Sequence, residues 1–279
     1  MKRLLSVFAA ASALALALTG CANYSQPTAS STKAPIVDLA GLKGKVLAVQ
    51  TDTTGQKYAE DHKAEFGYEI KVFDDLPGSV NAVLAGSADA AINDNGVLYD
   101  FAKQNPTTKV VKEFSTGEEY GFNVSKNNPG LLAVVNAALT EARADGSYNT
   151  IYQKWFGTDA PANTAPTAPA TSSEKPVLVD PSKLTTCTHL AYRPFQFLDT
   201  DNTTIIGFDV DLVDLVAKKL GVPQKIVDID FGQITSGSVF AAKKCDLGAA
   251  AITITPEREK AAPFSEGYFA ATQALLVKP

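Results

Sequence analysis

Two pairs of polar residues, Thr253 with Arg258 and Thr53 with Thr54, are suited to binding a carboxylate. The Arg258 guanidinium can donate two parallel hydrogen bonds to a carboxylate, which a lysine cannot do. Thr253 follows an apolar run and offers a hydroxyl and a backbone N–H. Thr53 and Thr54 stand between a predicted strand and a predicted helix, and a helix N-terminus favours an anion. The alternative for Arg258 is a surface ion pair with a neighbouring glutamate.

Asp94 is a candidate acceptor for a cationic group. It follows the apolar run 88–92, at the end of a predicted buried strand, where ligands of open α/β sheets bind. Aspartate is also a good helix N-cap, and the two roles can coexist. Because the neighbouring Asn93 and Asn95 could cap the following helix, we expect Asp94 to contact a ligand.

Alternating strands and helices must position these residues. The apolar run 247–252 predicts a buried strand, and apolar residues spaced by three and four after Asp209 predict a helix. Repeated units of this kind indicate an α/β fold with parallel sheets. Residues 158–176 are rich in Pro, Ala and Thr and hold no aromatic residue and no aliphatic residue larger than Ala. They cannot bury a core, so we expect a linker between 36–157 and 177–279.

The composition limits the classes of protein that this chain can be. It has 279 residues, 45% hydrophobic and 20% charged, with a formal net charge of −5. These values exclude a largely disordered chain and fit about two domains. No block of basic residues is present, so we expect no nucleic-acid partner. With only His62 and His189, a histidine-rich metal site is excluded, and we expect neither a metal nor a cofactor.

The first 35 residues predict export. A positive start precedes an apolar run too short for a transmembrane helix, so 1–20 has the layout of a signal peptide. Leu-Thr-Gly-Cys at 18–21 resembles a bacterial lipobox, which implies cleavage before Cys21 and a lipid on it. Residues 21–35 would then be a flexible, lipidated tether. This predicts a protein anchored to the outer face of the cell membrane, or a periplasmic one. A plain signal peptide with an incidental Cys21 is the alternative.

Two further cysteines, Cys187 and Cys245, could pair after export. We expect them instead to be buried and unpaired.

Several motifs cover both segments beside the linker. They are Ala-Ala-Ile-Thr-Ile-Thr-Pro-Glu-Arg at 250–258, Pro-Phe-Ser-Glu-Gly-Tyr at 263–268, Pro-Phe-Gln-Phe at 194–197, Ile-Gly-Phe-Asp-Val-Asp-Leu at 206–212 and Ile-Tyr-Gln-Lys-Trp-Phe-Gly at 151–157. Together they closely resemble the polar amino-acid-binding proteins of ABC importers, family 3 of the extracellular solute-binding proteins. The resemblance implies a type II periplasmic-binding fold, in which two α/β lobes close on a free amino acid. It also implies delivery to an ABC permease, and we expect a monomer. Glutamine or a glutamate-like amino acid is the candidate ligand.

The order of the motifs differs from the family's. The family begins with the segment found here at 177–279 and ends with the one at 36–157, so the chain resembles a circular permutant. The implied parts are lobe 2 at 36–119, the C-terminal-type segment of lobe 1 at 120–157, the linker at 158–176 and the N-terminal-type segment of lobe 1 at 177–279. A strand near 119–122 would be the only continuous hinge, and the second crossing between the lobes would be open.

The resemblance also assigns roles at the site. Arg258, Thr253 and Thr53 would bind the α-carboxylate of the ligand, and Asp94 its ammonium. The aromatic residues Tyr192 and Phe231 would flank its side chain, although core packing is the alternative for both. The other predicted ligand-binding residues are Thr54, Ala251, His189, Gln50, Asn93 and Asp52.

His189, Gln50 and Asp52 stand where glutamine-binding relatives have an acidic residue, a basic residue and a glycine. Neutral His189 and Gln50 could hydrogen-bond an amide, whereas protonated His189 could suit a carboxylate. A purely structural hydrogen bond is the alternative for His189.

Two other functions remain open. A few exported dehydratases share the fold, and Asp52 or His189 could serve as their acid or base. The chain has no G-x-S-x-G motif, and the implied amino-acid clamp favours a protein that is not an enzyme. A receptor that presents amino acids to a membrane sensor is the third reading.

Overall fold

The computed structural model describes residues 34–161 and 172–279. The predicted signal peptide, Cys21 and nearly all of the tether lie outside the described residues, as does the middle of the linker. Pro35–Pro279 forms one compact unit. Among the helices of the described ranges, none is both long and apolar enough to cross a membrane.

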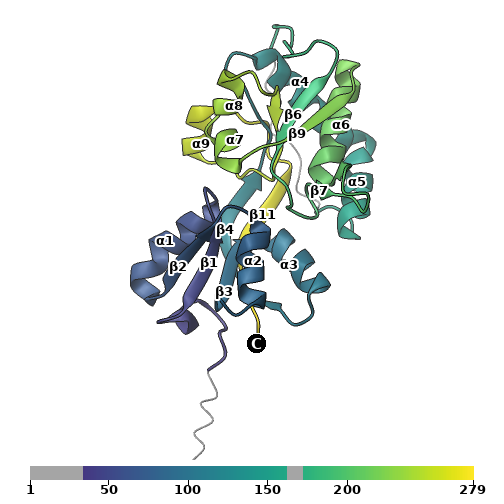
Figure 1. The fold of residues 1–279 in the computed structure, drawn as a ribbon. Coiled ribbons are helices and arrows are strands. Elements are labelled where there is room, and N and C mark those ends of the chain that lie inside the picture. Colours follow the sequence, from purple (N-terminus) through teal and green to yellow (C-terminus); the bar gives the residue numbers. More distant parts are fainter. Residues whose placement is uncertain (1–33, 162–171) are drawn as a thin grey trace, which may run out of the picture. The chain divides into compact units, whose positions relative to one another are not determined.

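The first lobe is built on a five-stranded sheet in the order β2-β1-β3-β11-β4 (Figure 1). Its strands are β1 (Val46–Gln50), β2 (Glu69–Phe73), β3 (Ala90–Asp94), β4 (Lys109–Tyr120) and β11 (Phe269–Val277). β1 runs parallel to β2 and β3, whereas β11 is antiparallel to β3 and β4. The helices of this lobe are η1 (Leu39–Leu42), α1 (Thr54–Phe66), α2 (Leu76–Leu84) and α3 (Asn95–Gln104). β1 and β3 therefore end at the same edge, where parallel α/β sheets bind ligands.

The second lobe is built on a four-stranded sheet in the order β5-β10-β6-β9. Its strands are β5 (Asn123–Val124), β6 (Leu184–Thr188), β9 (Gln224–Asp228) and β10 (Leu247–Gly248), with β7 (Phe197–Leu198) and β8 (Ile205–Ile206) as a separate pair. Its helices are α4 (Pro129–Asp145), α5 (Ser147–Phe156), α6 (Phe208–Leu220), α7 (Phe231–Thr235), α8 (Ser238–Ala241) and α9 (Pro256–Ala261). α4 and α5 precede the linker and pack against α6, which follows it.

The position of β11 shows that the expectation of a single covalent hinge is wrong. This strand follows the second lobe in sequence but lies between β3 and β4 of the first sheet (Figure 1). Leu275, Leu276 and Val277 are buried there, because a strand in the middle of a covered sheet needs apolar residues on both faces. The chain therefore crosses between the lobes twice, and the second crossing is continuous rather than open. Residues 269–277 belong to the first lobe's sheet and not, as expected, with 177–268.

The two crossings lie side by side. Phe269 of β11 pairs with Tyr120 of β4, and their rings stack with centroids 5.5 Å apart. Next to them, Tyr268 donates its N–H to the Tyr120 carbonyl at 2.8 Å and stacks on Phe122, with centroids 4.3 Å apart. These contacts make the hinge a two-stranded ribbon with an aromatic core.

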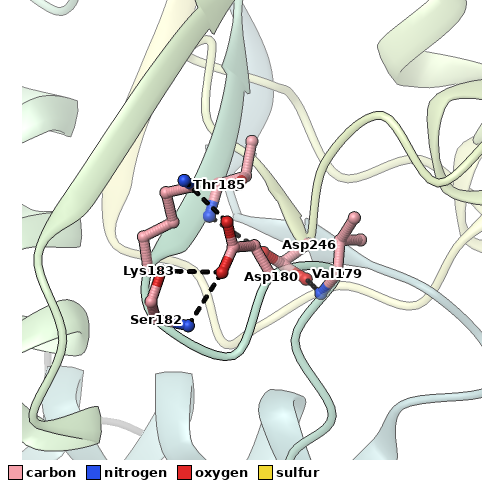
Figure 2. Close-up of polar contacts among 6 residues, drawn as sticks. All are labelled: Val179, Asp180, Ser182, Lys183, Thr185 and Asp246. Carbon is pink, nitrogen blue, oxygen red and sulfur yellow. Dashed lines mark hydrogen bonds and ion pairs between the residues drawn. The ribbon is translucent and has the colours of Figure 1, made fainter.

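Asp246 fixes the chain where it enters β6. Its carboxylate accepts the N–H groups of Val179 at 2.6 Å and Thr185 at 2.8 Å (Figure 2). In the turn between these residues, the Asp180 carboxylate pairs with Lys183 at 2.6 Å. The segment between the linker and β6 is thereby held against the loop that precedes β10.

Cys187 and Cys245 form a disulfide, so the expectation that they are unpaired is wrong. Cys187 lies in β6, and Cys245 stands two residues before β10. The loop before β10 brings the two Cα atoms within 5.7 Å, inside the range that a disulfide spans. Their separation of 58 residues in the sequence could not reveal this, because it depends on how that loop packs against β6.

Candidate functional site

A small cavity lies where the ends of β1 and β3 face the second lobe. It is lined by Gln50, Thr53, Thr54, Asp94, His189, Tyr192, Gln196, Phe231, Ala250, Ala251, Thr253 and Arg258. Ten of these were predicted from the sequence as ligand-binding residues. The structure brings them together from both lobes, and their contact with a ligand stays a prediction.

Arg258 lies in α9, a helix that is capped by the side chain of Thr255. Its Nη1 donates to the carbonyl of Thr253 at 2.9 Å, and its Nη2 donates to the carbonyl of Asp52 in the other lobe at 2.8 Å. The guanidinium carbon lies 5.3 Å from the centre of the Phe231 ring. Burial lowers the pKa of Arg258, and the negative charges of Asp94 and Glu118 oppose that shift. Arg258 thus belongs to the cavity and joins the lobes.

Thr53 and Thr54 form the start of α1. The Thr53 hydroxyl accepts the N–H of Gln56 at 3.0 Å and donates to the carbonyl of Gln50 at 2.7 Å. It is therefore engaged as the helix cap. The backbone N–H groups in the first turn of α1 can still donate hydrogen bonds to an anion.

Asp94 ends β3, and its side chain is buried. Its carboxylate accepts hydrogen bonds from the hydroxyls of Tyr120 and Tyr192, the latter at 2.9 Å, and from the Gln273 amide. Within the described chain it makes no side-chain cap on α3, so the alternative role as a helix cap is not the one observed. Burial, followed by the charge of Glu118, raises the pKa of Asp94 to about 6.

Asn93 and Asp52, both predicted to bind the ligand, are not among the residues that line the cavity. Asn93 lies behind the cavity wall, where it accepts from the Tyr192 hydroxyl at 2.6 Å and donates to the Gln50 amide oxygen at 3.3 Å. Asp52 sits at the rim with an exposed carboxylate and a left-handed backbone, φ 59°. Its carbonyl, rather than its carboxylate, contacts Arg258.

Ala251 lines the cavity, but its N–H points elsewhere. It donates to one oxygen of the buried Asp209 at 2.8 Å, and the Tyr268 hydroxyl donates to the other oxygen at 2.8 Å. Burial raises the pKa of Asp209 to about 7, while these two hydrogen bonds lower it. Asp209 therefore holds the backbone around Ala251, whose left-handed φ is 49°, in place beside the cavity.

Two walls of the cavity carry polar atoms with no partner among the described residues. His189 lies with Nδ1 3.0 Å from the carbonyl of Ile229, and its Nε2 is buried without a partner. Gln196, which was not predicted, donates its amide N–H to the His189 carbonyl at 3.2 Å and leaves its Oε1 buried and unpaired. The structural hydrogen bond considered for His189 is therefore present, and the second ring nitrogen is still free.

Besides Gln196 and Ala250, which line the cavity, the sequence analysis missed Glu118 behind it. Its carboxylate accepts the hydroxyls of Thr54 and Thr253, each at 2.7 Å, and the Gln273 amide at 3.0 Å. Thr54 belongs to the first lobe and Thr253 to the second, so Glu118 joins both behind the cavity. A signal was available: Glu118 lies two residues before Tyr120 on the same face of β4, and that face is buried at the hinge.

Comparison with known proteins places the chain among solute-binding proteins. The family model for bacterial extracellular solute-binding proteins, family 3, matches residues 24–158 and 184–279. The ABC transporter glutamine-binding protein of Bacillus subtilis is 33% identical over 46% of this chain and 46% of its own length. ABC transporter arginine-binding protein 1 of Escherichia coli is 32% identical over 42% of this chain and 49% of its own length.

The chain spans about half the length of the curated relatives it matches. A solved structure, the arginine-bound form of domain 1 from TmArgBP, is 33% identical over 35% of this chain and 80% of that chain. Its TM-score of 0.30 is too low to bear on the fold of the whole chain.

Proposed function

Because the chain belongs to the bacterial extracellular solute-binding proteins of family 3, we propose that it captures a polar amino acid between its lobes and delivers it to an ABC permease. The family and its two-lobed α/β fold, both expected from the sequence, are confirmed. The observation that carries the proposal is that Arg258 and Asp94 line one cavity from opposite lobes.

The chemistry of an amino acid fits this pair of residues. An α-carboxylate needs strong donors when it leaves water, and an α-ammonium needs an acceptor. Arg258 of the second lobe supplies a guanidinium and Asp94 of the first lobe a carboxylate. Only closed lobes satisfy both ends of the ligand together, so the ligand stabilises closure by its differential affinity for the two states.

The relatives support an amino acid as the ligand but do not select one. By their names, they bind glutamine, arginine, cystine and histidine. Glutamine or a glutamate-like ligand therefore stays a prediction for this chain. We further propose that the protein is exported and carries a lipid on Cys21, and that it acts as a monomer.

The chain order supports a circular permutation. β11 leads directly to the C-terminus, and η1 opens the same lobe at the other end of the described chain. The linker meanwhile joins α5 and β6 of the second lobe. A gene that connects 279 to 36 and opens the linker tests this arrangement. We expect its product to fold and to bind the same ligand within about threefold of the original affinity, since all packed elements are kept. A product that folds but no longer binds would contradict this equivalence.

The binding experiment uses the mature chain, unfolded and refolded to strip bound ligand, and titrates it calorimetrically with each of the twenty amino acids. We expect micromolar or tighter binding of at least one, with the ligand recovered unchanged by chromatography. Recovery of a converted product would favour the dehydratase-like alternative. No heat with any amino acid would contradict the proposal.

A further inference from the structure

His189 lines the cavity and carries a buried hydrogen-bond acceptor without a partner among the described residues. The carbonyl of Ile229 lies 3.0 Å from Nδ1 and can only accept, so Nδ1 carries the hydrogen. In the neutral ring, Nε2 then holds a lone pair, and this atom is buried without a partner within 34–161 and 172–279. Gln196, only 1% exposed, presents a second such acceptor, because its Nε2 is used by the His189 carbonyl and its Oε1 is unpaired.

Unpaired buried acceptors predict the kind of ligand group that would face them. Leaving a buried acceptor unsatisfied costs about 1–3 kcal/mol. A ligand side chain that donates N–H bonds removes this cost at both atoms. A side-chain carboxylate would instead bring further acceptors against these two and would be repelled.

The charges around the cavity favour the same kind of ligand group. Arg258 is the one lysine or arginine among the described residues that line it, whereas Asp94 lines it as a buried carboxylate. Glu118 lies directly behind the cavity lining. Thr54 and Thr253 both line the cavity, and the hydroxyls of both donate to the Glu118 carboxylate.

Glu118 makes two further hydrogen bonds. Besides Thr54 and Thr253 it accepts from the Gln273 amide at 3.0 Å and from the Thr116 hydroxyl at 2.7 Å. These four hydrogen bonds match in number the acceptor sites of a carboxylate. The site thus has two buried carboxyl groups, Asp94 and Glu118, against one guanidinium.

An amino-acid backbone brings one charge of each sign and leaves this imbalance unchanged. Closing the lobes would then bury a net negative charge, which is costly unless it is paired. A cationic side chain restores the balance. A planar guanidinium also carries five N–H donors, enough to serve both His189 Nε2 and Gln196 Oε1.

We propose that the ligand is an amino acid with a cationic, N–H-donating side chain, and that His189, Gln196 and Glu118 select it over neutral and acidic amino acids. The proposal rests on the function proposed above and deepens it. It also departs from the glutamine- or glutamate-like ligand expected from the sequence.

The test compares L-arginine with L-citrulline, which has nearly the same shape but a neutral urea group. Calorimetric titration of the ligand-stripped mature chain is run with both and with L-glutamine and L-glutamate. We expect arginine to bind about 10–100-fold more tightly than citrulline, and glutamate not to bind. Citrulline, glutamine or glutamate binding as tightly as arginine would overturn the selectivity and leave amino-acid capture intact. Binding of no amino acid at all would contradict the proposed function itself.

Glu118→Gln tests the charge with little change of size. We expect the preference for arginine over citrulline to fall by about tenfold or more, since one of the two buried charges is gone. The control is Glu119→Gln, which removes an exposed carboxylate from the next position of β4 and should leave that preference unchanged. A thermal melt of each variant verifies folding, and because the preference is a ratio, loss of active protein does not alter it. An unchanged preference in folded Glu118→Gln would contradict the role of Glu118.

Discussion

Arg258 and Asp52, 206 positions apart in the sequence, are joined by a 2.8 Å hydrogen bond from the guanidinium Nη2 to the backbone carbonyl. Arg258 lies in the second lobe, and Asp52 follows β1 of the first lobe. The same guanidinium holds the carbonyl of Thr253 at 2.9 Å. The group proposed to bind the ligand's carboxylate is therefore also a direct connection between the two lobes.

Arg258→Lys is expected to weaken amino-acid binding by about 10–100-fold, because the lysine keeps the charge but loses the planar pair of donors. Calorimetric titration with the amino acid that binds the wild-type protein measures this change in affinity. Arg193→Lys is the matched control, since Arg193 is half exposed and pairs with Asp100 at 3.4 Å outside the cavity. Equal losses in both variants would argue against a specific role for Arg258.

Asp94 is expected to give amino-acid binding a dependence on pH. Its pKa is raised to about 6, so the carboxylate that would pair with the ligand's ammonium is protonated below that pH. We expect the affinity to fall about tenfold between pH 7 and pH 5. Asp94→Asn should bind at least about tenfold more weakly than wild type at pH 7 and should lose most of this dependence. An affinity that stays constant from pH 7 to pH 5 would count against Asp94.

Asp209 should make the ligand-free protein more stable in mild acid. Its folded pKa of about 7 lies above the ordinary value of 3.8, so its contribution is fully present below about pH 4 and is lost as the pH rises through 7. Between pH 5 and pH 8 this corresponds to about 3 kcal/mol of unfolding free energy. Urea titrations at both pH values measure the unfolding free energy. From pH 5 to pH 8 it should fall less in Asp209→Asn than in the wild-type protein. If the unfolding free energy depended on pH in the same way in both proteins, Asp209 would not be the cause of that dependence.

The disulfide between Cys187 and Cys245 is expected to stabilise the fold rather than to take part in binding. A cross-link that closes a loop of this length contributes about 2–4 kcal/mol. The double variant Cys187→Ala, Cys245→Ala should therefore unfold at lower urea concentration, while its affinity at 25 °C stays within about threefold of wild type. A large loss of affinity in the folded double variant would place the disulfide in the binding machinery.

Much of the cavity could be predicted because its residues follow strands in short, continuous motifs. Thr53 and Thr54 come after β1 and Asp94 ends β3, so the sequence places them at one edge of one sheet. Thr253 and Arg258 lie in a single motif of the other lobe. Local sequence was enough in these cases, because the strand ends alone determine where the side chains meet.

The features that the sequence analysis missed depend on contacts between distant parts of the chain. Glu118 is buried only because Thr54 and Thr253 approach it from two lobes. The pairing of Cys187 with Cys245 depends on how the loop before β10 packs against β6. The apolar run of β11 predicts a buried strand, but nothing local to it tells which sheet it enters.

Ligand-dependent closure of the two lobes is the central claim, and the distance between them tests it most directly. Spin labels on cysteines placed at Glu65 of α1 and Lys260 of α9, both exposed, would report that distance by pulsed electron resonance. With the amino acid found by calorimetry, we expect the distance distribution of the stripped protein to narrow and shift to shorter values, and Arg258→Ala to abolish the shift. A distribution that is the same with and without saturating ligand would contradict the account.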